Sequence, residues 1–225
     1  MDKMNLFNDK TLKHYEGTLG IFDYDPKEFI IRKYGSFECL HYRGKGKSID
    51  LPKGCINTRY MFAECELPPG FSLGEHFDTS DVICMRGMFE ECKLSGSFSL
   101  GVNFDTSNVT DMSYMFYGCK LTEKFTLGHK FDTSNVVDMG GMFKDCKLPA
   151  GFSLGDHFDT SNVTDMCTMF YNCVMPKGFN LGEQFSTDGV VSMQHIFDGC
   201  TYYGVDVHEF FQTQNDEEII SRLKN

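Results

Sequence analysis

The sequence lacks several features that would indicate a membrane protein or an enzyme. It has no apolar run of 18 residues, so it predicts no membrane-spanning helix. Residues 1–17 lack the apolar core and small-residue cleavage site of a signal peptide, so we expect a cytoplasmic location, with the cell surface or secretion as the alternative. The sequence shows no nucleophile elbow, no glycine-rich phosphate loop and no Ser-His-Asp pairing. We therefore expect a protein that is not an enzyme and that uses no cofactor.

Positive charge is also scarce. Lys and Arg number 21 against 32 Asp and Glu, which gives a formal net charge of −11. The imbalance lies mainly in residues 51–200, which carry 19 acidic and 10 basic side chains. Because an acidic surface repels phosphates, this composition argues against nucleic acid as a partner.

A repeat of 27 residues organises the chain, and its clearest copy is Phe104–Cys119, FDTSNVTDMSYMFYGC. Tryptophan is absent, and the 22 phenylalanines, 13 methionines and 10 cysteines belong mostly to this repeat. No insertion or deletion breaks the spacing. Such a pattern predicts a solenoid, in which each unit buries its apolar side against its neighbours. The aligned positions are Phe77, Phe104, Phe131, Phe158 and Phe185; Phe62, Phe89, Phe116, Phe143, Phe170 and Phe197; and Cys65, Cys92, Cys119, Cys146, Cys173 and Cys200.

Each unit is predicted to hold one short strand and one short helix. Phe125 and Leu127 lie two residues apart, as on one side of a strand, and Gly128 ends the segment. Apolar residues then follow at helical intervals of three and four. The fold predicted is an α/β solenoid resembling leucine-rich repeats, built of 27-residue coils with parallel strands. The helical positions of this unit are Val136, Met139, Met142, Phe143 and Cys146, and the other strand pairs are Phe71/Leu73, Phe98/Leu100, Phe152/Leu154 and Phe179/Leu181.

The two ends of the chain depart from the repeat. We divide the chain into a β-rich N-terminal cap (1–50), a repeat solenoid of one partial and five full units (51–200), and a helical C-terminal cap (201–225). Caps are expected because an uncovered end unit would expose core and strand edge. The predicted end elements are a helix around Lys10–Tyr15, strands at Gly20–Tyr24, Glu28–Tyr34 and Phe37–Tyr42, an extended segment at Val205–Phe211, and a helix at Asp216–Leu223 capped by Asn215.

The motif FDTSNVTDMxxMFxxC, carried by residues 55–200, resembles the repeat of the BspA-like leucine-rich repeat family of bacterial surface proteins, which also occurs in mycoplasma lipoproteins. The resemblance implies a leucine-rich-repeat-like solenoid used for protein binding and adhesion, with no catalytic residues. The chain departs from that family in showing no secretion signal and no wall or lipid anchor.

Two columns of side chains have types that bind metals. One row of aspartates could form a calcium ladder, but a single carboxylate per unit followed by Thr and Ser favours a turn-capping role. The row of single cysteines does not converge on one point as a zinc site requires, so we interpret it as small buried side chains, with oxidation to disulfides as the alternative. We therefore expect no metal. The aspartates are Asp78, Asp105, Asp132 and Asp159.

Surface positions that vary between units indicate where a partner binds. We expect a protein partner on the side of the predicted strands. The contacts are expected at the small polar column, which is the position of Ser72, Ser99, Thr126, Ser153 and Asn180, and at the two residues that precede the phenylalanine of Phe77, Phe104 and their equivalents, which differ from unit to unit. The function predicted is a non-enzymatic protein-binding module, in its more specific form an acidic intracellular inhibitor of a bacterial or phage-related target; the alternative is a surface adhesin fragment that binds host protein. The protein is expected to be a monomer or an end-to-end dimer. The predicted partner-binding residues are Ser72, Glu75, His76, Ser99, Asn103, Thr126, His129, Lys130, Ser153, Asp156, His157, Asn180 and Glu183.

Overall fold

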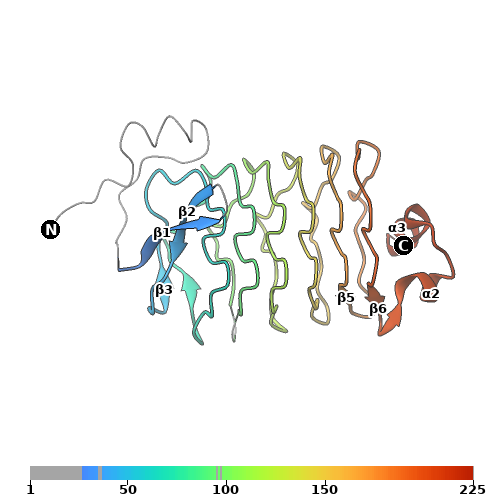
Figure 1. Cartoon of the computed structure of the whole chain (residues 1–225), viewed down its shortest axis with the longest axis horizontal. Helices are drawn as coiled ribbons and strands as arrows, with labels where there is room; N and C mark the ends of the chain where they lie inside the picture. Colours follow the sequence, from blue (N-terminus) through green and yellow to red (C-terminus); the bar gives the residue numbers. More distant parts are fainter. Residues whose placement is uncertain (1–26, 35–36, 95, 97, 225) are drawn as a thin grey trace.

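The computed structural model describes residues 27–34, 37–94, 96 and 98–224. Successive 27-residue units lie side by side along the long axis of the molecule (Figure 1). One end carries β1 (Phe29–Tyr34) and β2 (Phe37–Tyr42), and the other carries α2 (Val207–Phe211) and α3 (Asp216–Leu223). The predicted elements at Lys10–Tyr15 and Gly20–Tyr24 lie outside the described residues.

The N-terminal hairpin covers the first unit. β1 and β2 pair antiparallel, with Phe29 opposite Tyr42, which confirms the two strands predicted there. The Tyr42 N–H donates to the Met61 carbonyl at 2.7 Å, and the Tyr42 ring lies 5.4 Å from the ring of Phe62. The hairpin therefore joins the stack through this backbone bond, through aromatic packing and through an ion pair between Arg32 and Glu64 at 2.8 Å.

Neighbouring units are joined by parallel backbone pairing between residues 27 positions apart. Within it, the Ile83 N–H donates to the Ile56 carbonyl and the Met85 N–H donates to the Asp111 carbonyl, both at 2.9 Å. Such pairing holds adjacent units about 4.8 Å apart. We call the surface along this row the ladder face. The row of bridged residues is Asn57, Cys84, Asp111, Asp138, Asp165 and Ser192.

The helix predicted in each unit is wrong, because two residues per unit adopt the left-handed conformation. In one unit these are Tyr114 (φ 57°) and Gly118 (φ 61°). A left-handed residue cannot continue a right-handed helix. The Met115 N–H donates to the Met112 carbonyl three residues back, whereas the Phe116 N–H crosses to the next unit. Apolar spacing of three and four therefore comes from successive tight turns.

The strands predicted at the Phe-x-Leu segments are also wrong, except in the first unit. There β4 (Ser72–Leu73) pairs in parallel with β3 (Ser48–Ile49). The described strands form three small sheets near the two ends, and both described helices follow residue 206. A strand and helix do not recur from unit to unit, so the predicted α/β solenoid of leucine-rich-repeat type is not the fold of this chain.

The core consists of ladders of identical side chains. Phe89, Phe116 and Phe143 stack with ring centroids 5.6 and 5.7 Å apart. On the Phe-x-Leu side, equivalent rings are farther apart, at 6.3–6.5 Å. Equivalent residues are related by the step from one unit to the next, so the stack is wider on this side than at the ladder face.

The C-terminal end is closed by β5 (Val174–Met175), β6 (Thr201–Tyr202), β7 (Val205–Asp206) and the two helices. The predicted helix at Asp216–Leu223 is confirmed, with the Asn215 side chain as its cap. The extended segment predicted at Val205–Phe211 is wrong after Asp206. The Asp206 carboxylate accepts from the N–H groups of His208 and Glu209, and this cap starts α2.

Candidate functional site

The predicted partner-binding residues lie on one surface, which we call the Phe-x-Leu face and define as residues 71–76, 98–103, 125–130, 152–157 and 179–184. All are exposed except Asn103, which is half-buried. The Asn103 side chain donates to the Glu75 carbonyl at 2.7 Å, so it links two units. No contact with a partner tests these residues, and their role stays a prediction.

The small polar column of this face has a local structural task. The oxygens of Ser99, Ser153 and Asn180 accept from the N–H of the glycine two residues on, at 3.2, 3.1 and 2.6 Å. Each of those glycines has a φ of 83–86°, where a side chain would be strained. The monotony of the column therefore has a local cause in turn formation.

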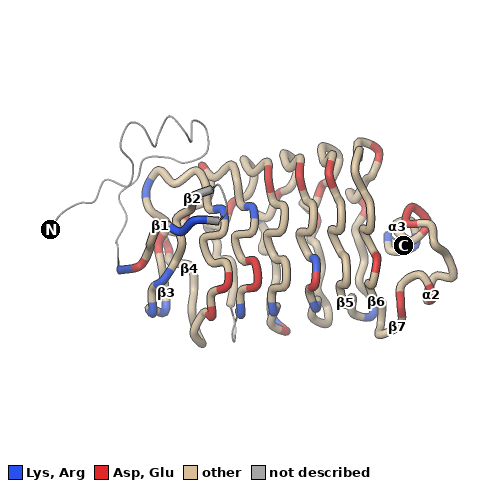
Figure 2. The backbone as a smooth tube through the Cα atoms, viewed as in Figure 1, with Lys and Arg blue, Asp and Glu red and all other residues tan. Residues whose placement is uncertain are grey.

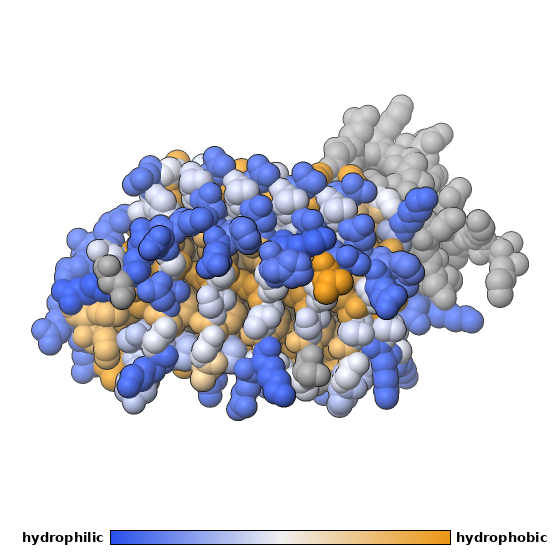
Figure 3. Space-filling model, turned by 180° about the vertical axis from the view of Figure 1, so that it is seen from behind, coloured by the Kyte–Doolittle hydropathy of each residue, from blue (hydrophilic) through white to orange (hydrophobic). Residues whose placement is uncertain are grey.

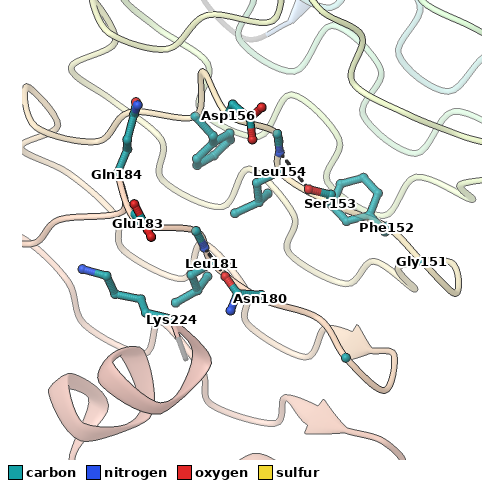
Figure 4. A pocket seen from close by; sticks show the side chains of 14 residues that line it. Gly151, Phe152, Ser153, Leu154, Asp156, Asn180, Leu181, Glu183, Gln184 and Lys224 are labelled. Carbon is teal, nitrogen blue, oxygen red and sulfur yellow. Dashed lines mark hydrogen bonds between the residues drawn. The ribbon is translucent and has the colours of Figure 1, made fainter.

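A cavity of about 660 Å³ lies between two units at the C-terminal end of this face. It brings together four predicted residues: Ser153 and Asp156 from one unit, and Asn180 and Glu183 from the next (Figure 4). Its apolar lining is made of Phe152, Leu154, Phe158 and Leu181, and Lys224 after α3 lines the opposite wall. The cavity thus combines an apolar floor with two carboxylates and one ammonium group.

A second, smaller hollow of about 170 Å³ gathers His129, Lys130 and His157. Two aspartates line it as well, and the Lys130 ammonium lies 3.9 Å from the Asp105 carboxylate. Both hollows therefore hold two carboxylates and one ammonium group, and the smaller one adds two imidazoles.

Main-chain groups on the Phe-x-Leu face are paired at the two ends and open between them. In the first unit, the N–H groups of Ser72 and Gly74 donate to carbonyls of the segment before it, at 2.9 and 2.6 Å. In the last, the Leu181 N–H donates to the Leu223 carbonyl at 2.8 Å. Among the described residues, the N–H groups of Ser153 and Leu154 donate to no protein acceptor. The wide unit spacing on this side leaves them open.

The ladder face carries a column that the sequence interpretation missed. Its side chains alternate between aliphatic residues and threonine, and Ile83, Val137 and Val191 are 37%, 44% and 84% exposed. Thr110 and Thr164 stand between them and donate to carbonyls of the preceding unit. The signal available was a β-branched residue at one position of every unit, a composition typical of strands.

On the face seen in Figure 3, apolar residues are visible between rows of more polar side chains.

The predicted turn-capping role of the aspartate row is confirmed. Asp78, Asp105, Asp132 and Asp159 each accept from the N–H two residues on, at 2.8–3.0 Å. The bonds from Ser80 lower the pKa of Asp78. These carboxylates are oriented into their own turns. In the part of the chain that the structure describes, no three Asp, Glu, His or Cys side chains gather as a metal site.

A second carboxylate row runs along the ladder face through Asp111, Asp138 and Asp165. The Gly140 N–H donates to Asp138 at 2.9 Å. Burial, together with the carboxylates on either side, raises the pKa of Asp138 even though that hydrogen bond lowers it. The ladder therefore holds this carboxylate at an electrostatic cost.

The repeat cysteines are free thiols, and those from Cys92 to Cys200 are buried, whereas Cys65 is half-buried. Burial raises the pKa of the Cys146 thiol to about 12. The interpretation of this column as small buried side chains is confirmed for the five later units.

Charge is distributed unevenly along the molecule. Lys and Arg gather near β1–β3, whereas Asp and Glu occur along the units and around α3 (Figure 2). Neither described helix is long and apolar enough to cross a membrane.

Comparison with known proteins gives one match. The family described as "Mycoplasma protein of unknown function, DUF285" matches residues 56–150 and 152–222, which is well over half of the chain. No curated protein and no solved structure matches. The match agrees with the expected kinship to mycoplasma repeat proteins, while the specific BspA-like leucine-rich repeat motif stays a prediction. The chain belongs to the DUF285 family.

Proposed function

We propose that this protein is a non-enzymatic protein-binding module whose Phe-x-Leu face takes a partner with a basic surface. The observation that supports the proposal is the cavity in which Asp156 and Glu183 stand over an apolar floor. Protein interfaces combine such buried apolar contact with charges at the rim.

The electrostatics favour a basic partner. The net charge of −11 attracts cationic surfaces and speeds their encounter, and this attraction weakens as salt screens it. In its most specific form, the proposal is that the protein covers a basic surface of an intracellular bacterial or phage-related target and so inhibits it.

The test is affinity capture from lysate of the native host at low and high salt. A single stoichiometric partner is then purified, and its Kd is measured with the native protein and with Glu75→Gln/Asp156→Asn/Glu183→Gln. These three carboxylates are exposed on the Phe-x-Leu face. We expect the triple variant to bind about three- to 100-fold more weakly, since exposed pairs contribute about 0.2–1 kcal/mol each.

The matched control neutralises three exposed carboxylates away from that face, Asp81→Asn/Glu91→Gln/Glu209→Gln. It has the same net charge as the first variant and is expected to keep most of the affinity. Equal weakening by both variants would reduce the effect to net charge and refute the assigned face. Retention of host extracellular proteins in place of a lysate partner would favour the surface adhesin. The same purified complex gives the oligomeric state, for which a monomer or an end-to-end dimer is predicted.

A further inference from the structure

The step between units on the Phe-x-Leu face has a consequence for what can bind there. Ring centroids of Phe71, Phe98, Phe125, Phe152 and Phe179 are separated by 6.3, 6.5, 6.3 and 6.4 Å in turn. Because these residues are equivalent, the distances measure the repeat of the molecule along this side. The repeat is nearly constant over four steps.

An extended polypeptide has almost the same period. Its rise is about 3.3 Å per residue, and alternate side chains point the same way, so side chains on one side recur every 6.6 Å or so. An extended chain lying along the stack therefore places one side chain over each unit. It stays in register across the whole face.

The open main-chain groups provide bonds for such a chain. The N–H groups of Thr126, Leu127, Ser153 and Leu154 donate to no protein acceptor within the described residues. At the C-terminal end the protein already satisfies the equivalent group with its own main chain, since the Leu181 N–H donates to the Leu223 carbonyl at 2.8 Å. Main-chain bonds of this kind supply affinity in peptide recognition, and side-chain positions supply specificity.

The side chains at one exposed position of successive units indicate which peptide sequence would fit this face. The position three residues after the small polar column holds two adjacent carboxylates, Asp156 and Glu183, at the mouth of the cavity (Figure 4). Val102 holds this position nearer the N-terminus and is 69% exposed. Lys224 also lines this cavity. Read from the first unit to the last, the position is Glu75, Val102, His129, Asp156 and Glu183.

We propose that the Phe-x-Leu face binds an extended, basic peptide segment lengthwise, with two peptide residues per unit and with basic side chains at alternate positions over Asp156 and Glu183. This rests on the proposed protein-binding function and adds the conformation and the residue spacing of the ligand. A peptide that matches the whole column also has an apolar residue over Val102 and a basic residue over Glu75.

The test uses two labelled nine-residue peptides of identical composition. One places its two lysines at alternate positions, and the other places them next to each other; all other residues are uncharged and favour extended conformations. Fluorescence anisotropy at low salt measures the Kd of each with the full chain. We expect the alternating peptide to bind about two- to fivefold more tightly, since only its two ammonium groups can reach both carboxylates at once, which adds one exposed ion pair.

Protein variants locate the effect. Asp156→Asn/Glu183→Gln is expected to remove the preference for the alternating peptide, while Asp81→Asn/Glu91→Gln keeps it. Lys224→Gln is expected to tighten binding of the alternating peptide, because it removes a positive charge from the cavity lining.

Equal affinity of the two peptides for the native protein would overturn the proposed register. If the captured partner still depends on Asp156 and Glu183 in that case, the protein-binding function stands and only the extended ligand is refuted. If neither the peptide preference nor the captured partner responds to Asp156→Asn/Glu183→Gln, both proposals fail.

Discussion

Replacing Gly141 with alanine tests how closely one unit fits the next. Gly141 has a φ of 63°, and a Cβ there would lie 2.6 Å from Cε1 and 2.7 Å from Cδ1 of Tyr114 in the preceding unit. The left-handed conformation costs an alanine about 1–2 kcal/mol. Reduced freedom of the unfolded chain returns about 0.4–1 kcal/mol of this.

The contact with Tyr114 adds a second cost. To make room, the ring must leave the Arg86 guanidinium, 5.1 Å from its centroid, and the Tyr117 ring at 6.1 Å. Such contacts contribute about 0.5–1.5 kcal/mol each. We therefore expect Gly141→Ala to lower the free energy of unfolding by about 2–4 kcal/mol, a Tm loss on the order of 5–12 °C.

Gly199→Ala is the matched control. Its φ of 68° is similar, but the nearest atom to an added Cβ is Asn172 Oδ1 at 3.5 Å, an ordinary contact. This variant carries the conformational cost alone, about 1 kcal/mol. Urea unfolding followed by far-UV circular dichroism measures both, since the chain has no tryptophan. Equal losses for the two variants would refute the argument from the Tyr114 contact, and Tyr114→Ala combined with Gly141→Ala should recover the excess.

Three further predictions concern stability and reactivity. Because the pKa of Asp138 is raised in the folded protein, its charge destabilises the fold above that pKa. Asp138→Asn should therefore raise the Tm at pH 7, and the gain should shrink as the pH falls from the raised pKa toward the ordinary value of 3.8 and be absent below it; a gain independent of pH would contradict this. Thr133→Val should cost about 1–3 kcal/mol in urea unfolding, because the buried Thr133 hydroxyl donates to the Asp159 carbonyl at 2.8 Å, while Thr133→Ser keeps the bond and should cost less. In a thiol titration at pH 8, half-buried Cys167 should react before the buried Cys119 and Cys146, and loss of the fast phase in Cys167→Ser checks the assignment.

Some of the core could be predicted from the sequence because burial depends on apolar type and spacing. The phenylalanine and cysteine ladders needed only the 27-residue register, which an uninterrupted repeat displays directly. The hairpin strands and α3 were also predictable, since each has local signals that agree with its final structure.

The helix in each unit was predicted wrongly because tight turns can imitate its apolar spacing. A contrary signal was present in the column before the closing cysteine, which reads Glu64, Glu91, Gly118, Asp145, Asn172 and Gly199. Gly, Asn and Asp are the residues that tolerate positive φ, and every member of this column has a φ of 52–68°. Helical periodicity alone does not reveal backbone handedness, whereas the residue types in one column can.

The candidate site was only partly within reach of the sequence. Aligned positions place Asp156 and Glu183 in one column, but the cavity depends on how far apart the units stand. That separation is set where neighbouring units pair along the ladder face and stack their rings on the Phe-x-Leu side, and the sequence of a single unit does not reveal either distance.

The difference in spacing also decides which face suits an extended ligand. The ladder face exposes Ile83 and Val137, and the Phe-x-Leu face exposes Val102. The ladder face, however, repeats about every 4.8 Å, roughly one and a half extended residues, so the side chains of a chain lying along it would not stay in register with successive units. On the Phe-x-Leu face the repeat of 6.3–6.5 Å is close to two residues, and the mismatch over four steps stays at about 1 Å. The spacing therefore favours the Phe-x-Leu face for a regular peptide, and it does so without reference to charge.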